Sequence, residues 1–176
     1  STMRGQFSKK SPEFKHMDEW LDKIVQKEVE AYKIYKLTAV PVFFDIPFLK
    51  SSGTAGKVIG YKSLKAILDL QNEVVYLLNT DTKESSIIAG AEIVKKAHNL
   101  AIHGKEIFLM NDDGVIQIDS KSKSSKVVIT KDSAWGEIAA IATYGGNIYL
   151  LDRGKNRIWK YIAIDTGFSD RITYLN

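Results

Sequence analysis

One sequence pattern occurs three times in this chain, as Ala66-Ile67-Leu68-Asp69, Ile107-Phe108-Leu109-Met110-Asn111 and Ile148-Tyr149-Leu150-Leu151-Asp152. The final Asp or Asn of these copies recurs at intervals of 42 and 41 residues. In each copy a short apolar run ends at a residue type that favours a turn. A repeat of about 41 residues built in this way is typical of one four-stranded blade of a β-propeller.

Each copy is surrounded by three further segments whose composition favours β-strands. A turn containing Gly, Asn or Asp follows each copy, as expected for a hairpin. The expected strands around the three copies are residues 57–60, 74–78 and 86–89, then 99–102, 115–119 and 126–130, then 137–141, 157–161 and 171–175. The sequence therefore predicts an all-β domain of about three four-stranded antiparallel blades, with repeats near residues 57–89, 99–130 and 138–175.

An ordinary antiparallel β-sandwich is the alternative, because it also has short strands separated by turns. A sandwich, however, has no reason to repeat its anchor residues at a fixed interval. The repeat therefore favours an incomplete propeller.

Composition excludes several classes of protein. The 176 residues are enough for one domain, and a hydrophobic content of 44% is enough for a packed core. The chain has no cysteine, so disulfides and thiolate metal sites are excluded. No apolar run approaches the roughly 20 residues that cross a bilayer, and no signal-peptide pattern opens the chain.

The positive charge is concentrated at the start of the chain. The formal net charge is +4, and residues 1–16 contribute most of it through Arg4, Lys9, Lys10 and Lys15 against Glu13. Residues 17–176 are therefore almost neutral. A nucleic-acid partner is not predicted, because it would require a basic footprint on the folded part.

Residues 1–16 are interpreted as a vector-derived leader, since they lack an amphipathic period and directly precede Met17. The alternative is a basic arm that binds an acidic surface. Residues 17–36 are expected to form an amphipathic helix, with Asp18 as N-cap and an apolar face made of Leu21, Ile24, Val25, Val29 and Tyr32. Two roles stay open for this helix, which either packs on the blades or ends a longer helical stem.

No motif predicts catalysis. Residues 53–58 resemble a phosphate-binding loop, but only two residues separate the glycines and Val58 follows the lysine. Residues 111–114 resemble part of a calcium loop, but Leu109 and Ser120 would stand at its first and last ligand positions. We therefore expect no catalytic residue, no metal and no cofactor. The Lys- and Ser-rich run 121–126 is interpreted as a solvated loop.

The connections between blades are the predicted place for a ligand, because propellers usually bind on a face formed by their loops. One connection contains His98, and the next contains Asp132 and Trp135. A Trp exposed in a loop offers a flat surface for stacking of a sugar or a peptide. Trp135, Asp132 and His98 are therefore the candidate ligand-binding residues. The alternative for Trp135 is packing between two blades.

The last repeat resembles a known family. Residues 146–152, Gly-Asn-Ile-Tyr-Leu-Leu-Asp, followed by residues 156–161, Asn-Arg-Ile-Trp-Lys-Tyr, are similar to the repeat of bacterial propellers of the broad NHL and YVTN type. Residues 41–46, which lead into the repeats, are similar to uncharacterised bacterial proteins in which a helical stem precedes a propeller. The resemblance covers roughly residues 37–176. It implies an interaction or sensing role and carries no catalytic residue onto this sequence.

Three blades are fewer than the four to eight that close a propeller. We therefore expect either a fragment of a longer protein or a homodimer that closes a six-bladed ring. The predicted function is a non-enzymatic scaffold that recognises an unidentified protein or glycan. A glycan-binding module that uses Trp135 and a fragment of a propeller hydrolase or lactonase are the alternatives. The compartment is not predicted, and the chain is expected to be soluble, alone or as part of a larger membrane-anchored bacterial protein.

Overall fold

A computed structural model describes residues 4–33, 35 and 39–174 of the chain. These residues fall into two compact units, residues 1–43 and 44–176. The first unit contains a short 3-10 helix, Arg4–Gln6, and the helix α1, Pro12–Tyr32. None of the helices in the described residues combines the length and the apolar content that a membrane span needs.

Helix α1 begins earlier and ends earlier than the predicted helix 17–36. The hydroxyl of Ser11 accepts a hydrogen bond from the backbone N–H of Phe14 at 3.2 Å, and Pro12 occupies the first turn, so Ser11 rather than Asp18 caps the helix. The helix ends where Lys33 adopts a left-handed backbone with φ of 55°. Residues 34 and 36 of the predicted helix lie outside the described residues. Helix α1 buries none of its side chains within its own unit.

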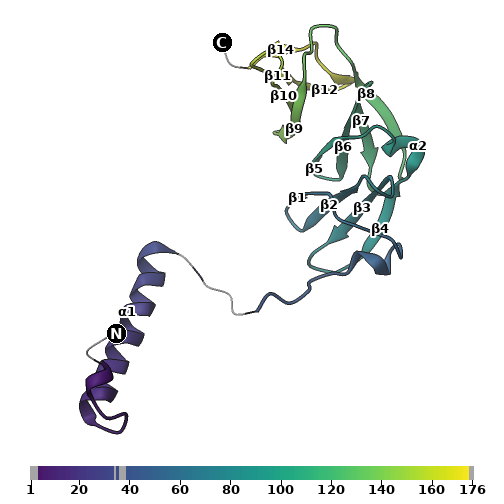
Figure 1. The fold of residues 1–176 in the computed structure, drawn as a ribbon. Helices are drawn as coiled ribbons and strands as arrows, with labels where there is room; N and C mark the ends of the chain where they lie inside the picture. Colours follow the sequence, from purple (N-terminus) through teal and green to yellow (C-terminus); the bar gives the residue numbers. More distant parts are fainter. Residues whose placement is uncertain (1–3, 34, 36–38, 175–176) are drawn as a thin grey trace. The chain divides into compact units, whose positions relative to one another are not determined.

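The second unit contains three four-stranded antiparallel sheets, each ordered along the chain (Figure 1). We call them blade A, blade B and blade C. Blade A consists of β1 (Lys57–Tyr61), β2 (Leu64–Asp69), β3 (Val74–Asn79) and β4 (Ser85–Ala89). Blade B consists of β5 (Asn99–His103), β6 (Glu106–Asn111), β7 (Gly114–Asp119) and β8 (Ser125–Thr130). Blade C consists of β9 (Ile138–Tyr144), β10 (Asn147–Asp152), β11 (Arg157–Tyr161) and β14 (Ile172–Thr173).

These sheets are propeller-type blades, as the repeat predicted. The first strands β1, β5 and β9 are neighbours, so successive blades meet along their first strands (Figure 1). Side-chain hydrogen bonds also join successive blades. Lys57 Nζ donates to the carbonyl of His98 at 2.8 Å, and Asn99 Nδ2 donates to the carbonyl of Ala139 at 3.0 Å. The last predicted strand, 171–175, is shorter than expected, and its residue 175 lies outside the described residues.

Two apolar layers hold the blades together. The layer between blades A and B includes Leu68, Val75 and Leu109, and the layer between blades B and C includes Met110, Val115 and Leu150. Strand residues alternate between the two faces of a sheet, so blade B contributes one set of side chains to the layer with blade A and the other set to the layer with blade C. The core therefore lies between the blades rather than within any one of them.

The two ends of the row of blades differ. At blade A, Ile46 and Leu49 of the segment around a 3-10 helix, Ile46–Phe48, pack on Ile67, Val74 and Tyr76. At blade C, the face that points away from blade B has no such cover among the described residues, and Leu151 on it is 46% exposed. One end of the row is thus closed and the other is open.

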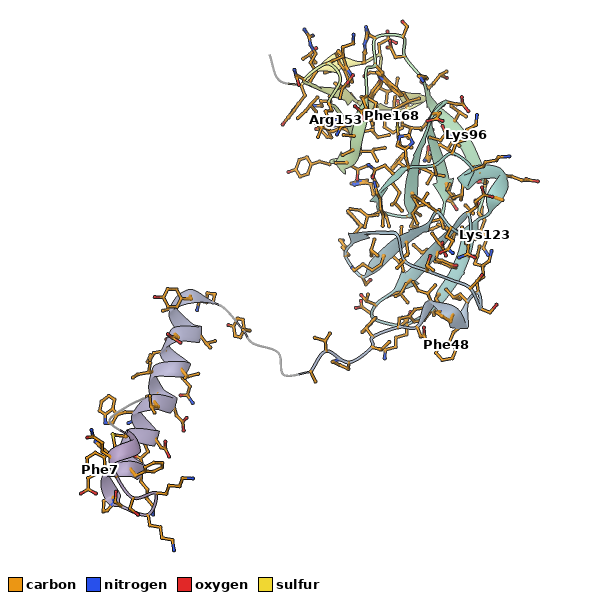
Figure 2. All side chains as sticks on the ribbon, in the orientation of Figure 1. Phe7, Phe48, Lys96, Lys123, Arg153 and Phe168 are labelled. Atoms are coloured by element: carbon orange, nitrogen blue, oxygen red, sulfur yellow. The ribbon has the colours of Figure 1, made fainter. Side chains whose placement is uncertain are left out.

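The sequence did not predict a hairpin inserted into blade C. Strands β12 (Ala163–Ile164) and β13 (Gly167–Phe168) pair with each other between β11 and β14. Phe168 of this hairpin is labelled in Figure 2. Its ring contacts that of Phe108 of blade B edge to face, with ring centroids 5.9 Å apart. The short helix α2 (Ala91–Val94) was also not predicted and lies in the connection from blade A to blade B.

Candidate functional site

Antiparallel strands in sequential order place the connections on two opposite edges of the blades. The first edge, which we call the connection edge, holds the turns after β2, β6 and β10 and the links between blades. The second, which we call the groove edge, holds the residues between strands 1 and 2 and between strands 3 and 4 of blades A and B, namely 62–63, 80–84, 104–105 and 120–124. The two edges have different chemistry.

A buried carboxylate fastens the connection edge of blade A. The carboxylate of Asp69 accepts hydrogen bonds from the backbone N–H of Thr54 at 2.7 Å and from that of Asn72 at 3.0 Å. The hydroxyl of Tyr76, seven residues after Asp69, also donates to it at 3.1 Å. The carboxylate thereby joins the incoming chain, the turn after β2 and strand β3.

Blade C repeats this arrangement. The carboxylate of Asp152 accepts hydrogen bonds from the backbone N–H groups of Gly136 at 2.8 Å and Lys155 at 3.0 Å, and from Trp159 Nε1 at 2.8 Å. Trp159 again stands seven residues after the carboxylate. In blade B the turn after Asn111 is shorter, and Ile116 occupies the register position of Tyr76 and Trp159. The repeated Asp is thus a structural anchor rather than a reactive group.

The anchoring carboxylates should make the stability sensitive to acid. Burial alone would raise the pKa of Asp69 and Asp152, but hydrogen bonds from Thr54 and Gly136, among others, outweigh it and hold the pKa of both carboxyls below the ordinary value. A carboxylate whose pKa is lowered by folding stabilises the protein above its unfolded pKa of about 4, and this contribution is lost as the pH falls through the folded value. We expect the free energy of unfolding, measured by urea titration, to decrease as the pH is lowered below about 4.

The matched control for this acid dependence is Asp152→Ala, which removes one of the two titrating anchors. Its free energy of unfolding should change less between about pH 5 and pH 3 than that of the wild type, because fewer protons are taken up on unfolding. Equal pH slopes for the two proteins would show that Asp152 does not titrate as argued.

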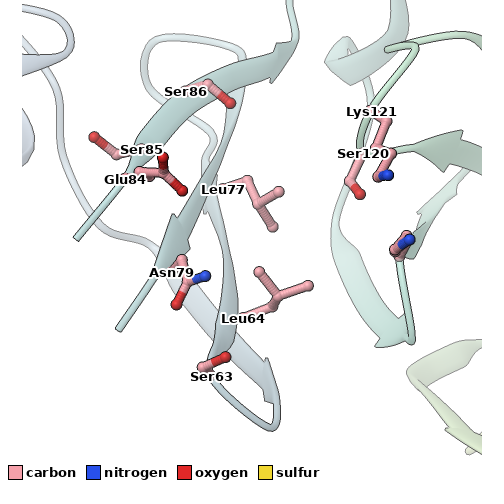
Figure 3. A pocket seen from close by; sticks show the side chains of 10 residues that line it. Ser63, Leu64, Leu77, Asn79, Glu84, Ser85, Ser86, Ser120 and Lys121 are labelled. Carbon is pink, nitrogen blue, oxygen red and sulfur yellow. The ribbon is translucent and has the colours of Figure 1, made fainter. Parts of the chain in front are cut away.

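A groove of about 700 Å³ opens between blades A and B on the groove edge. Leu64 and Leu77 of blade A form its apolar floor and point toward Ser120 and Lys121 of blade B (Figure 3). The groove is lined in full by Ser63, Leu64, Leu77, Asn79, Glu84, Ser85, Ser86, Lys105, Ser120 and Lys121. Hydroxyl and ammonium groups therefore stand beside partly buried aliphatic side chains.

Equivalent turns form the two walls of this groove. In blade A the side-chain oxygen of Asn79 accepts from the backbone N–H of Asp81 at 2.9 Å, and in blade B the carboxylate of Asp119 accepts from that of Lys121 at 2.9 Å. Such side-chain caps fix a turn without help from a ligand. The walls are therefore formed before any ligand binds.

The interpretation of Trp135 as a ligand-binding residue requires an exposed side chain, and the structure does not show one. Trp135 is only 8% exposed and belongs to the apolar layer between blades B and C. Its Nε1 donates to the hydroxyl of Tyr161 at 2.8 Å, and burial raises the pKa of Tyr161 to about 12 although this hydrogen bond opposes the rise. Trp135 therefore packs between two blades, as the alternative interpretation stated. A buried indole whose N–H is already hydrogen-bonded offers no stacking surface to a ligand.

The other two candidate residues lie in different places. His98 lines a hollow of about 310 Å³ between blades B and C, which Trp135 also borders, and His98 Nδ1 lies 4.0 Å from Asp112 Oδ1. Asp132 borders a separate hollow of about 220 Å³, where its carboxylate lies 3.2 Å from the guanidinium of Arg171. The structure therefore does not bring the three predicted residues into one site.

Sequence reasoning missed the groove on the other edge. Lys121 belongs to the run 121–126, which was interpreted as a solvated loop, yet it lines the groove together with Lys105. The groove residues of blade A are 19 or more positions away from those of blade B and form no motif, so no local signal reveals them. In the part of the chain that the structure describes, no group of three His, Cys, Asp or Glu side chains could hold a metal ion.

No protein-family model matches the sequence, and no curated protein matches it either. Among solved structures, the N-terminal domain of Nup159 is similar with a TM-score of 0.46 and 11% identity, and human WBSCR16 with a TM-score of 0.46 and 14% identity. The hemopexin fold protein CP4 from cow pea gives a TM-score of 0.42 and 13% identity. The matches cover 68%, 69% and 65% of this chain but 30%, 38% and 62% of those chains. The similarity concerns the fold and carries no information on function.

Proposed function

We propose that this chain is a non-enzymatic recognition scaffold that binds a partner protein in the groove between blades A and B. The observation that carries the proposal is the composition of the groove, in which Leu64 and Leu77 lie beside the polar side chains of Ser120 and Lys121. Binding sites typically combine an apolar floor with a few polar groups that fix orientation, and volumes of about 300–1,000 Å³ are usual. The preformed walls reduce the entropy that binding would cost.

The state of the buried acids supports a scaffold rather than an enzyme. Although burial opposes it, the pKa values of Asp69 and Asp152 are lowered because both carboxylates accept hydrogen bonds from backbone N–H groups and from side chains, which include Thr54 at Asp69 and Trp159 at Asp152. A general acid or base needs a pKa near the working pH and an open path to a substrate. These carboxylates are buried and occupied with structural hydrogen bonds, so they are poor candidates for acid–base chemistry.

Burial of Trp135 removes the feature that favoured a glycan-binding module, and a lactonase or hydrolase fragment gains no support from the groove. The NHL or YVTN type, the bacterial origin and the link to a membrane-anchored protein rest on the resemblance alone.

A ring made from two copies would have to place a blade on the end of blade A that Ile46 and Leu49 already cover. Light scattering after size exclusion tests this ring, which requires the mass of a dimer.

Selection from a displayed library of random peptides tests the scaffold proposal without assuming the chemistry of the ligand. The full chain serves as bait, and Ser120→Trp fills the groove, while Ser133→Trp adds the same bulk on the connection edge. Circular dichroism verifies that both variants fold. We expect the enriched peptides to bind wild type and Ser133→Trp alike, and to bind Ser120→Trp at least about tenfold more weakly, a loss of about 1.4 kcal/mol. A library that yields no binders, or binders indifferent to Ser120→Trp, would contradict the proposal.

A further inference from the structure

Lysines are concentrated in the turns of the groove edge. Five of them occur there in blades A and B, against two acidic residues, and they are Lys62, Lys83, Lys105, Lys121 and Lys123, with Asp81 and Glu84 as the acids. The folded part of the chain is otherwise almost neutral, so this edge is a local positive feature rather than a reflection of the whole composition. A local concentration of one sign of charge attracts ligands of the opposite sign.

Three of these lysines occupy backbone conformations that lysine rarely adopts. Lys62, Lys83 and Lys123 have φ values of 51°, 59° and 58°, in the left-handed region where Gly or Asn is normally found. An L-residue with a side chain raises the backbone energy there.

The two lysines that line the groove are available to a ligand. Among the described residues neither Lys105 nor Lys121 takes part in a salt bridge. Asp119 is the acid next to Lys121 along this edge, and its carboxylate already accepts hydrogen bonds from the backbone N–H of Lys121 and from the backbone N–H and hydroxyl of Ser122. Neither ammonium group of the blade B wall is thus held in a salt bridge, although Lys121 and the Asp119 carboxylate attract each other electrostatically.

The aliphatic floor and the ammonium groups lie in the same groove but are contributed by its two different sides. Leu64 and Leu77 come from blade A and Lys121 comes from blade B (Figure 3), and Lys105 also belongs to blade B. A ligand that satisfies both walls must carry an aliphatic group and an anionic group a short distance apart. Resting on the proposed function, we propose that the groove binds an acidic peptide segment, with an aliphatic side chain on the leucines and carboxylates at the lysines.

A peptide fits this groove better than a nucleic acid of similar charge. Glu84 stands on the blade A wall and would repel a continuous row of phosphates, whereas a peptide can place its acidic residues on one side only. Serine hydroxyls on both walls, such as those of Ser86 and Ser120, can hydrogen-bond to peptide backbone groups. The floor of two leucines has no counterpart in the recognition of a phosphate backbone.

The inference is tested with synthetic peptides and the full chain by fluorescence anisotropy. The probe is a fluorescein-labelled peptide with the core Ser-Asp-Leu-Asp-Ser, in which an extended backbone places both acids on the side opposite the Leu. The comparison peptides replace its Leu by Gly or its acids by Lys. The double variant Lys105→Glu with Lys121→Glu reverses the charge of the groove wall. The double variant Lys131→Glu with Lys155→Glu makes the same change on the connection edge, and all four side chains are exposed, so all variants should fold.

We expect the acidic leucine peptide to bind, the groove variant to weaken binding at least tenfold, and the connection-edge variant to change it less than twofold. Raising sodium chloride from about 50 to 300 mM should weaken binding as well, because salt screens the lysines. The inference is overturned if the basic peptide binds as well as the acidic one, if the groove variant has no effect, or if a single-stranded oligonucleotide binds more tightly than the peptide. If the peptides enriched from the library are not acidic and lose binding to Ser120→Trp, this inference is overturned and the scaffold proposal still stands.

Discussion

Replacing Leu68 or Met110 by alanine should lower the free energy of unfolding by about 2–5 kcal/mol, whereas Leu151→Ala should lower it by about 1 kcal/mol or less. These residues hold the same position in blades A, B and C, since each pairs across the sheet with the corresponding residue of the next strand, Val75, Val115 and Ile158. Their exposures differ, at 0%, 3% and 46%. The difference arises because blades A and B are each followed by another blade, whereas no blade follows blade C among the described residues.

Urea denaturation followed by circular dichroism measures the three changes under one set of conditions. The surrounding face of blade C also carries Tyr149 and Tyr174, whose rings contact edge to face at 5.1 Å with Lys160 Nζ 5.7 Å from each ring. If Leu151→Ala costs as much as the other two substitutions, this face is covered in solution. A cost that depends on protein concentration would then identify a second copy of the chain as the cover.

Asp69→Ala and Asp152→Ala should each lower the free energy of unfolding by about 3–5 kcal/mol, while Asn111→Ala should cost about 1 kcal/mol. Each Asp carboxylate accepts several hydrogen bonds from buried or partly buried donors, and alanine would leave those donors without a partner. Asn111 caps its own short turn through the backbone N–H of Asp113 at 2.9 Å. Removal of that cap should resemble the loss of an ordinary side-chain to backbone hydrogen bond.

Thermal and urea unfolding of the three variants test this ranking. Asn111→Ala is the matched control, because it removes a side chain of similar size from the same position of a blade. Similar losses for all three variants would mean that the carboxylates contribute no more than local turn capping. Trp159→Phe should lower the free energy of unfolding by part of the amount expected for Asp152→Ala, because the Asp152 carboxylate then loses the hydrogen bond of 2.8 Å from Trp159 Nε1.

Most of the fold could be predicted because its information is local and repeated. A short apolar run that ends at Asp or Asn defines a strand and its turn, and the regular interval defines the blade. The prediction of three propeller-type blades is confirmed, and the strands fall within a few residues of their expected positions. The hairpin β12–β13 escaped prediction because it has no counterpart in the other two repeats.

The sites could not be predicted in the same way, because they depend on contacts between distant residues. Trp135 looked like an exposed loop residue, yet Tyr161 and the apolar layer between blades B and C enclose it. The groove combines turns of two blades, and its leucines are indistinguishable in sequence from other core residues. One signal was available at the anchors, where an aromatic donor follows Asp69 and Asp152 at a spacing of seven residues.

Amide chemical-shift mapping of the labelled chain with the acidic leucine peptide tests the recognition groove most directly. The expected result is a set of shifts confined to the groove edge, at the backbone N–H groups of Ser63, Lys105, Ser120 and Lys121, with little change on the connection edge. Shifts at His98 and Lys131, which line the hollow between blades B and C, would contradict the assignment of the groove as the binding site.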